Sequence, residues 1–256
     1  MTNFIEIMNL GITYRAKDGL IRAIEKVDLD AREGEFVTIV GPSGCGKTTL
    51  LKGVAGLLPP TSGFIKIGGE LVRGTNSNVG MVFQSPVLMA WRTIMENIML
   101  QVEIRNLDKK TYKRRAEELI TLTGLSGFEN KYPYQLSGGM QQRASICRAL
   151  IHDPPILLMD EPFGALDALT REQMSIELQR IWLEKAKTVF FITHSIQESV
   201  FLGDKIVVLS PRPAKIMEII TPDLRRPREI STMVEPKFSA TVDHIRRLLS
   251  ARSGME

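Results

Sequence analysis

The chain has 256 residues, and its 43% hydrophobic content is enough to bury the core of one or two globular domains. Its 33 basic and 29 acidic residues leave a net charge of +4 that is spread along the chain, which gives little support to nucleic-acid binding. No uninterrupted apolar run approaches the ~20 residues of a membrane span. Residues 1–6 lack a basic region followed by an apolar stretch, so no secretory signal is expected.

The first segments along the chain predict strands. Residues 5–10 and 23–29 alternate in polarity, which indicates an antiparallel sheet lying beside the core. The next segment, Phe36–Val40, is continuously apolar, which is typical of a parallel strand covered by helices on both faces. It leads into residues 41–48, which match the pattern G-x-x-x-x-G-K-[ST].

A loop of this pattern turns its N–H groups inward onto phosphate oxygens at the start of the next helix. Lys47 would reach the β- and γ-phosphates, and the Thr48 hydroxyl would bind Mg²⁺. The sequence therefore predicts that the chain binds a nucleoside triphosphate.

Cys45 lies inside this loop beside Lys47, where the inward N–H groups and the ammonium favour a reactive thiolate. The alternative is an inert small residue that fills the loop. Cys45 and Cys147 lie in unrelated contexts, so a reduced, cytosolic protein without a disulfide is expected.

Strands and helices alternate along the rest of the chain. Further strands are expected at 64–67, 79–83, 156–159, 189–192, 205–209 and 215–220. Helices are expected at 47–57, 108–123, 137–152, 169–185 and about 241–251. About seventy residues, 86–153, read as helices and loops inserted into an α/β core. The later basic residues predict a solvated face; they are Arg212, Lys215, Arg225, Arg226 and Arg228.

Two adjacent acids end the apolar strand at 156–159. Because neighbouring strand residues point to opposite sides, Asp160 and Glu161 can take different roles. Asp160 can support the Mg²⁺ ion, while Glu161 faces the γ-phosphate and polarises an attacking water. The alternative is a pair of acids exposed in a turn.

A second glycine-rich helix start lies at residues 137–139. Ser137 as a cap, followed by Gly138 and Gly139, makes a second anion-binding nest. This nest can close on a nucleotide held by another copy of the chain. Taken alone, the segment could equally be a well-capped helix.

In this order the motifs resemble those of the nucleotide-binding subunits of ATP-binding cassette (ABC) transporters, over about residues 5–220. Residues 41–48 are similar to the Walker A loop, 156–161 to Walker B, 136–140 to the signature and 164–167 to the D-loop. Gln84 matches the Q-loop glutamine and His194 the switch histidine. Tyr14, expected in a loop, sits where the family places an aromatic ring against adenine. Each of these last three residues alone also has a purely structural explanation.

The resemblance implies an α/β fold of the P-loop NTPase (ABC ATPase) class. This fold has a parallel sheet, an N-terminal antiparallel β subdomain and an inserted helical subdomain at about 86–153. Residues 1–222 would form one ATPase domain, followed by a tail at 223–256. The implied activity is ATP hydrolysis coupled to transmembrane transport, with ATP and Mg²⁺ as cofactors.

The resemblance also implies three sets of site residues. The catalytic set is Lys47, Gln84, Glu161 and His194. The nucleotide-binding set is Tyr14, Gly41, Pro42, Ser43, Gly44, Cys45, Gly46, Lys47, Thr48, Thr49, Ser137, Gly138, Gly139 and Asp167. The metal-binding set is Thr48, Gln84 and Asp160.

One departure from the family signature narrows the resemblance. Met140 stands where the family most often carries Gln, but Ser137 and the backbone of the two glycines would face the phosphate, so ATP contact should be kept. Met140 and residues 91–93, 161–167 and 210–213 are similar to those of an importer group that handles nitrate, sulfonates, taurine and related small solutes.

The partners implied are a second copy that shares two ATP molecules, multi-span permease subunits that dock near residues 84–91, and indirectly a solute-binding protein. The location implied is peripheral, at the cytoplasmic face of the inner membrane, and no nucleic acid is expected. The rival interpretation is a non-transport ABC-type ATPase, such as a DNA-repair or translation factor. Such proteins usually carry a long coiled-coil insertion or two cassettes, whereas residues 86–153 show no sustained heptads. A P-loop kinase or GTPase would lack the nest at 137–139.

Overall fold

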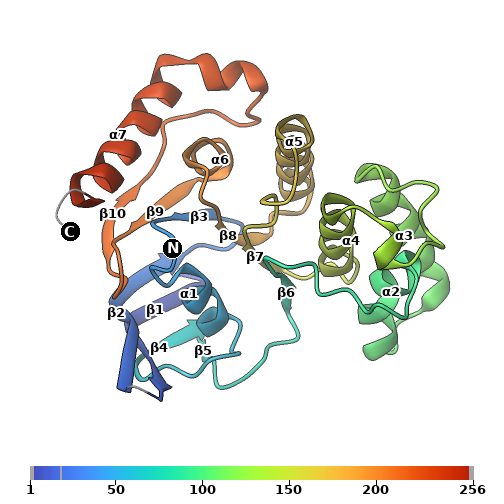
Figure 1. The fold of residues 1–256 in the computed structure, drawn as a ribbon, viewed down its shortest axis with the longest axis horizontal. Coiled ribbons are helices and arrows are strands. Elements are labelled where there is room, and N and C mark those ends of the chain that lie inside the picture. The colour runs from blue at the N-terminus through green and yellow to red at the C-terminus, as the bar shows by residue number, and fades with distance from the viewer. Residues whose placement is uncertain (1–2, 18, 254–256) are drawn as a thin grey trace.

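Two β-sheets and the helices between and around them form the core, as the computed structural model shows for residues 3–17 and 19–253 (Figure 1). The larger sheet has the strand order β10-β9-β3-β8-β7-β6. Its strands are β3 (Phe36–Val40), β6 (Val79–Val82), β7 (Ile156–Asp160), β8 (Thr188–Ile192), β9 (Lys205–Leu209) and β10 (Ile216–Ile220). Every pair in this sheet is parallel except β9 with β10. The carboxyl ends of β3, β7 and β8 therefore meet at one edge.

The continuously apolar strands are buried on both faces, as their sequence predicts. In β3, Phe36 and Val40 belong to one core cluster and Val37 and Ile39 to another. The second cluster is shared with helix α1 (Lys47–Val54) and the smaller sheet. Helices α5 (Ala168–Lys185), α6 (Ile196–Leu202) and α7 (Pro236–Ser253) lie on the opposite face of the larger sheet (Figure 1).

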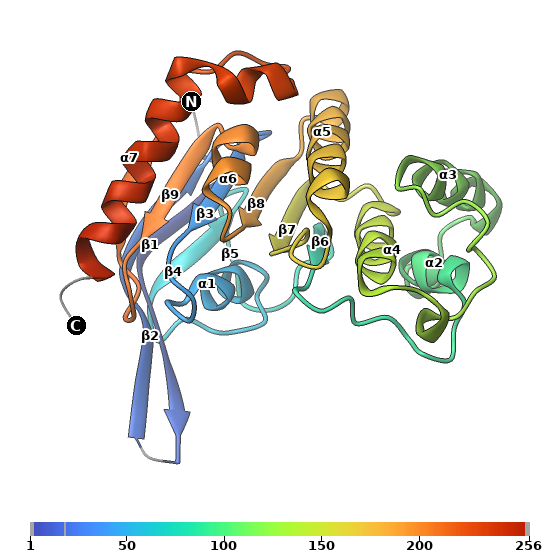
Figure 2. The same ribbon diagram turned by 45° about the horizontal axis from the view of Figure 1, so that its top comes forward.

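The smaller sheet is antiparallel, with the order β2-β1-β4-β5, which confirms the expectation from alternating polarity. Its strands are β1 (Ile5–Ala16), β2 (Gly19–Ala31), β4 (Ser62–Ile67) and β5 (Glu70–Leu71). The hairpin of β1 and β2 projects beyond the body of the molecule (Figure 2). The predicted strand at 5–10 was too short, because cross-strand pairing continues as far as Ala16 with Gly19.

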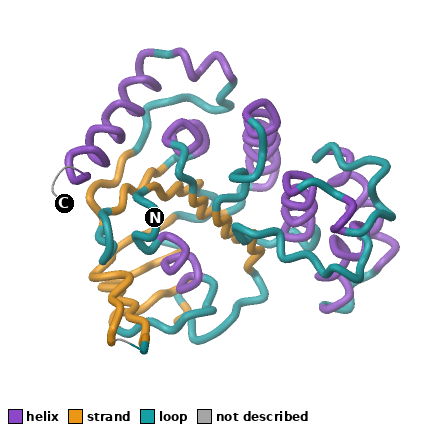
Figure 3. The backbone as a smooth tube through the Cα atoms, viewed as in Figure 1, coloured by secondary structure: helices purple, strands orange, loops and turns teal. Residues whose placement is uncertain are grey.

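A group of helices lies beside the larger sheet, next to β6 and β7 (Figure 1). It comprises α2 (Ile94–Ile104), α3 (Lys109–Leu122), the 3₁₀ turn η1 (Pro133–Gln135) and α4 (Gly138–Leu150). Figure 3 shows only helices and loops in this part. Asp108 caps α3 as predicted, because its carboxylate accepts the N–H groups of Lys110 and Thr111. Thr93 and Glu96 form a capping box that starts α2. None of the helices formed by the described residues is both long and apolar enough to cross a membrane.

The tail packs on the core through two arginines that were expected on a solvated face. Arg228 is 2% exposed, and its Nη1 donates to the carbonyl oxygens of Val200, Phe201 and Gly203 at the end of α6. Arg226 forms an ion pair with Asp204 at 2.8 Å. The expectation is wrong for these two residues because the last carbonyl groups of α6 need donors, and the tail supplies them. The 3₁₀ turn η2 (Ile230–Val234) then leads into α7.

Candidate active site

The glycine-rich loop, residues 41–48, joins the carboxyl end of β3 to the first turn of α1. Two of its glycines are required by close backbone approaches. A Cβ on Gly46, where φ is +125°, would lie 2.8 Å from the carbonyl oxygen of Ala23. A Cβ on Gly41 would lie 3.0 Å from the carbonyl oxygen of Leu209. Glycine therefore allows the loop to sit directly against β2 and β9.

The start of α1 is open to an anion. No side chain of the described residues caps this helix, so the N–H groups of its first turn can bind a phosphate. The Nζ of Lys47 lies over the loop and donates to the carbonyl oxygens of Gly41 at 2.8 Å and Pro42 at 2.9 Å. Ser43 and Gly44 are exposed. Free N–H groups beside a lysine ammonium fit the phosphates of a nucleoside triphosphate.

The thiol of Cys45 is turned away from this surface. Cys45 is 1% exposed and belongs to the core cluster between the two sheets. Burial raises the pKa of the thiol, and the Lys47 ammonium lowers it by less. The prediction of a reactive thiolate is therefore wrong, because an apolar environment disfavours the charged form.

Two oxygens suited to Mg²⁺ meet beside the loop. The Thr48 hydroxyl donates to the Asp160 carboxylate at 2.8 Å, across the gap between α1 and β7. Asp160 is 3% exposed, and burial is the main cause of its raised pKa. The adjacent Glu161 raises that pKa further, whereas the hydrogen bond from Thr48 lowers it. A hydroxyl and a buried carboxylate next to a phosphate-binding loop fit a hard cation that keeps several water and phosphate ligands.

Three predicted catalytic side chains come together at the sheet edge. The Glu161 carboxylate Oε2 accepts a hydrogen bond from Gln84 Nε2 at 3.1 Å and lies 3.4 Å from His194 Nδ1. The three residues follow the ends of β6, β7 and β8. Gln84 contacts Glu161, and no hydrogen bond among the described residues joins it to Thr48 or Asp160.

The backbone of Glu161 is held in a conformation that is uncommon for this residue. Its φ is 46°, in the left-handed region, and its N–H donates to the carbonyl oxygen of Ile192 at 3.0 Å. Such strain concentrates at functional sites, where the surrounding fold maintains it. Here it holds a carboxylate against Gln84 and His194, where it can accept a proton or orient a water.

Tyr14 lies near the loop at 41–48, but it belongs to a different element than expected. It belongs to β1 rather than to a loop, because the strand extends to Ala16. Its hydroxyl lies 3.1 Å from the Thr49 hydroxyl in the first turn of α1. The ring is thereby fixed beside the start of α1, where a nucleotide base can stack on it.

The remaining predicted nucleotide contacts lie elsewhere. Ser137 caps α4, and its hydroxyl accepts the N–H of Met140 at 3.3 Å. Ser137 and Gly138 are exposed, while a Cβ on Gly139 would lie 3.1 Å from Leu166 Cδ2. Asp167 caps α5 by accepting the N–H of Thr170 at 3.0 Å, and this hydrogen bond is the main cause of its lowered pKa. No hydrogen bond or ion pair of the described part of the chain joins these residues to the loop at 41–48.

Two buried polar residues of α4 were missed by the sequence predictions. Gln142 Nε2 donates to the carbonyl oxygen of Phe83 at 3.0 Å, directly before Gln84. Arg148 donates to the carbonyl oxygens of Pro86 and Val87 at 2.9 and 2.8 Å. These bonds attach the segment that carries Gln84 to α4. The available signal was a pair of polar side chains on a helix whose other buried positions are mostly apolar.

Comparisons with known proteins agree with this geometry. The sequence model of the ABC transporter family matches residues 24–164. An uncharacterized ABC transporter ATP-binding protein of Methanocaldococcus jannaschii is 47% identical over 225 residues, which cover 88% of this chain and 84% of that protein. The taurine import ATP-binding protein TauB of Rhizobium johnstonii is 42% identical over 251 residues, 96% of each chain.

Solved structures give the same result at the level of the fold. A dimeric bacterial ABC transporter cassette has a TM-score of 0.78 and 34% identity, covering 85% of this chain and 98% of the other. A dimeric post-hydrolysis cassette bound to ADP and Pi has a TM-score of 0.78 and 33% identity, with the same coverage. The predicted α/β fold with its P-loop is thereby confirmed. The chain belongs to the ABC transporter family, as one of its ATP-binding and ATP-hydrolysing cassettes.

Proposed function

We propose that this cassette drives the import of a small anionic or zwitterionic solute of the taurine type. The observation that carries its catalytic part is the contact of Glu161 with both Gln84 and His194 at the mouth of a phosphate-binding loop. The solute class is supported by several relatives of 42–45% identity that are named taurine import ATP-binding proteins. The matched names favour a transporter subunit over the DNA-repair or translation alternative.

In the proposed reaction, residues 41–48 and the first turn of α1 hold the phosphates, with Lys47 on the β- and γ-phosphates. Tyr14 stacks on the base, and Thr49 fixes the Tyr14 hydroxyl. Thr48 and Asp160 would hold Mg²⁺, assisted by Gln84. When bound, this ion neutralises charge on the phosphate oxygens.

Hydrolysis of the γ-phosphate then depends on three side chains. The Glu161 carboxylate accepts a hydrogen bond from the attacking water and orients it toward the γ-phosphate. His194 donates a proton or hydrogen bond at the same place, and Gln84 keeps the carboxylate oriented. Their positions at adjacent strand ends allow all three to reach one water.

We propose further that two copies share two ATP molecules. Ser137, Gly138 and Gly139 of each copy would close on the γ-phosphate bound by the other, with Asp167 beside it. The exposed start of α4 supports this assignment, because its first-turn N–H groups and helix dipole favour an anion. The dimeric form of the matched cassettes supports it as well.

The permease would dock where the helical group meets the core. A groove of about 330 Å³ lies there, lined among others by Met81, Phe83, Val87, Met89 and Arg148. Trp91, at the end of the same loop, is 75% exposed. A permease helix seated here would contact the segment that Gln142 and Arg148 attach to α4.

The same proposal assigns residues 1–222 to one ATPase domain, about 86–153 to its helical subdomain and 223–256 to a tail. It also places the cassette peripherally at the cytoplasmic face of the inner membrane.

The test is reconstitution with the permease and the solute-binding protein that the proposal implies. ATP-dependent taurine uptake into proteoliposomes is the expected result, and uptake should be lost with Glu161→Gln. Trp91→Ala should keep the thermal unfolding temperature and the basal ATPase rate but weaken co-purification with the permease. Val234→Ala, at an apolar residue that is 82% exposed in η2, is the matched control. Undiminished permease binding by a stable Trp91→Ala protein would contradict the docking site, and ATP-driven uptake of another solute alone would contradict the taurine class.

A further inference from the structure

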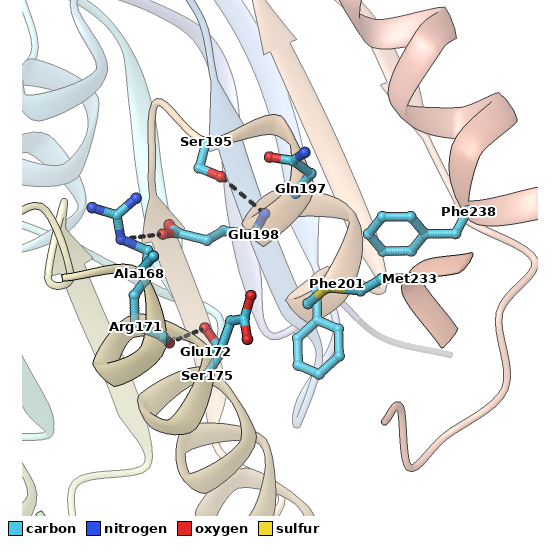
Figure 4. A pocket seen from close by; sticks show the side chains of 10 residues that line it. All are labelled: Ala168, Arg171, Glu172, Ser175, Ser195, Gln197, Glu198, Phe201, Met233 and Phe238. Atoms are coloured by element: carbon cyan, nitrogen blue, oxygen red, sulfur yellow. Dashed lines mark hydrogen bonds and ion pairs between the residues drawn. The ribbon is translucent and has the colours of Figure 1, made fainter. Parts of the chain in front are cut away.

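A largely buried carboxylate connects the two residues that flank His194. Glu198, in the first turn of α6, has an 11% exposed side chain. Its Oε2 accepts a hydrogen bond from the Thr193 hydroxyl at 2.5 Å, and that hydroxyl in turn accepts the N–H of Ser195 at 2.9 Å. The Glu198 N–H donates to the Ser195 hydroxyl at 3.3 Å, as one dashed line in Figure 4 shows. The turn that carries His194 is therefore closed on itself through Glu198.

The same carboxylate reaches a second helix. Glu198 Oε1 lies 3.3 Å from Arg171 Nε on α5, and Figure 4 shows these two side chains pointing toward one another. Arg171 Nη2 also donates to the carbonyl oxygen of Leu166 at 3.1 Å, in the loop just before Asp167. Arg171 thus donates a hydrogen bond to the loop that starts α5 and forms an ion pair with the carboxylate that holds the His194 turn.

The connection extends to the second phosphate-binding nest. The Cα of Gly139 packs so closely on the loop before α5 that a Cβ would lie 3.1 Å from Leu166 and 3.3 Å from the carbonyl oxygen of Ala165. A continuous set of contacts therefore runs from Gly139 through Leu166 and Arg171 to Glu198. Its far end is the turn of His194, whose side chain is 57% exposed and lies 3.4 Å from Glu161 through Nδ1. Because more than half of this side chain is exposed, its position depends largely on its backbone turn.

This ion pair is partly shielded from water, since the Glu198 side chain is 11% exposed and that of Arg171 is 30% exposed. Desolvation raises the pKa of Glu198, while the Thr193 hydrogen bond and the Arg171 charge lower it. Removing one partner of such a pair leaves a buried, under-bonded group, which disturbs its surroundings more than the loss of a surface pair does. The pair also forms part of the wall of a cavity of about 270 Å³ lined by Phe201, Met233 and Phe238 of α6, η2 and α7 (Figure 4). Replacements of equal size can therefore be accommodated without a clash.

We infer that Glu198 and Arg171 are positioning residues that couple the loop at 164–167 to His194. Closure of a second copy on Gly139 and Asp167 is transmitted through Arg171 and Glu198, and it fixes the turn that presents His194 to Glu161. This inference rests on the proposed roles of His194 and of the shared ATP sites. It predicts that hydrolysis is cooperative only while the ion pair is intact.

The test compares Glu198→Gln, Arg171→Gln and the double variant with the parent cassette. Each protein should bind ATP with a Kd within about twofold of the parent, since no changed group touches the loop at 41–48. The kcat should fall about tenfold with KM nearly unchanged, because the histidine is misplaced rather than removed. The Hill coefficient for ATP should fall toward one. The double variant should be no slower than either single variant, because both break the same connection.

Two further variants separate the alternatives. Arg171→Lys keeps the charge beside Glu198 but has one nitrogen in place of the guanidinium fork, which contacts Glu198 through Nε and Leu166 through Nη2. Its kcat should therefore lie between those of the parent and Arg171→Gln. Arg180→Gln, which breaks an ion pair with Glu177 on the same helix, should keep the parental kcat and Hill coefficient. His194→Ala, measured beside them, tests the proposed function itself.

The outcomes distinguish the two claims. If His194→Ala keeps full kcat, the proposed role of the histidine is wrong. If His194→Ala is inactive while the Glu198 and Arg171 variants keep the parental kcat and Hill coefficient, the coupling is wrong. Additive losses in the double variant, or parallel losses of kcat, ATP binding and thermal stability, would assign the pair a merely structural role.

Discussion

The predicted nucleotide contacts around residues 41–48 are assembled within one chain, whereas those predicted around residues 137–139 lie apart from them. In the first, Thr48 bonds to Asp160 at 2.8 Å and Gln84 to Glu161 at 3.1 Å. In the second, Ser137 is exposed and its hydroxyl only caps its own helix. In the first region the predicted catalytic and metal-binding side chains already contact one another. In the second region the start of a helix is exposed.

The difference follows from topology. The carboxyl ends of adjacent parallel strands meet at one sheet edge, so residues far apart in sequence are brought together without a partner. The start of α4 belongs to the helical group, which lies to one side of that edge (Figure 1). A single chain therefore brings the predicted hydrolytic side chains together, and in the proposed dimer a second chain would enclose the phosphate.

The largest effect on kcat is expected from a substitution of Glu161, which lies between Gln84 and His194 in the first region. Glu161→Gln keeps the side-chain size but removes the carboxylate that accepts a proton. The kcat should fall ~10²–10⁴-fold while ATP binding is retained, and ATP-bound dimers should accumulate. Steady-state ATPase assays and size-exclusion chromatography with ATP measure both effects. Glu70→Gln, in β5 at an exposed position, is the control, and near-normal turnover by Glu161→Gln would reject the assignment.

The next effect tests whether the second region acts on the partner's nucleotide. Lys47→Ala and Ser137→Arg chains should each be inactive alone. A mixed dimer would contain one doubly defective site and one intact site, so it should recover up to about half of the parental rate if the sites work independently. Recovery is measured after mixing differently tagged chains and purifying the heterodimer. Purified heterodimers without any recovery would contradict independent sites shared between chains.

Much of the first region could be predicted because its signals are local. The apolar runs of β3, β7 and β8 are buried on both faces, and the residues that follow them carry the chemistry. Helix α6 was missed because it is only seven residues long and has no full amphipathic repeat. Helix α2 was not singled out, since its apolar sequence lacks a marked polar face, although Thr93 and Glu96 gave a capping-box signal.

The misjudged residues depend on partners that are distant in sequence. The sequence predicted that Arg226 and Arg228 are solvated. Their hydrogen-bond acceptors are Asp204 and the end of α6, which only tertiary packing brings next to them. The close contact of Gly139 with Leu166 is likewise invisible in the sequence. Local patterns therefore predicted the residue types of the site, while the buried polar network around it required the structure.

A moderate effect is expected at the junction between the two regions. Asp153 forms ion pairs with Arg115 of α3 at 3.1 Å, with Lys185 of α5 at 2.6 Å and with Lys187 at 2.5 Å. Burial alone would raise the pKa of Asp153, but the hydrogen bonds from these cations outweigh it and hold the pKa well below its usual value. Asp153→Asn should lower the free energy of unfolding at pH 7 by about 2 kcal/mol.

The pH dependence of the free energy of unfolding tests whether the charge of Asp153 causes this stabilisation. Because the folded pKa is depressed, the carboxylate stabilises the fold at pH values above its unfolded pKa of about 3.9, and this contribution is lost as the pH falls below that value. Parent and variant should therefore converge in stability between about pH 4 and pH 2. Urea unfolding at a series of pH values measures this. Asp243→Asn, at an exposed ion pair on α7, should have little effect. A constant difference at all pH values would show that the charge of Asp153 is not responsible.

The smallest effect concerns the thiol inside the loop, where the phosphate-binding face and the core face of the same segment differ. Cys45 is buried among apolar side chains, and its raised pKa leaves little thiolate at neutral pH. In a Cys147→Ala background, which removes the other thiol, alkylation of the folded chain should be at least ~10-fold slower than in urea, because both access and thiolate fraction are reduced. MgATP should then add little further protection, since the nucleotide occupies the opposite face of the loop. Rapid labelling of the folded chain that MgATP abolishes would instead place the thiol on the phosphate side, and the contrast between the two faces would be lost.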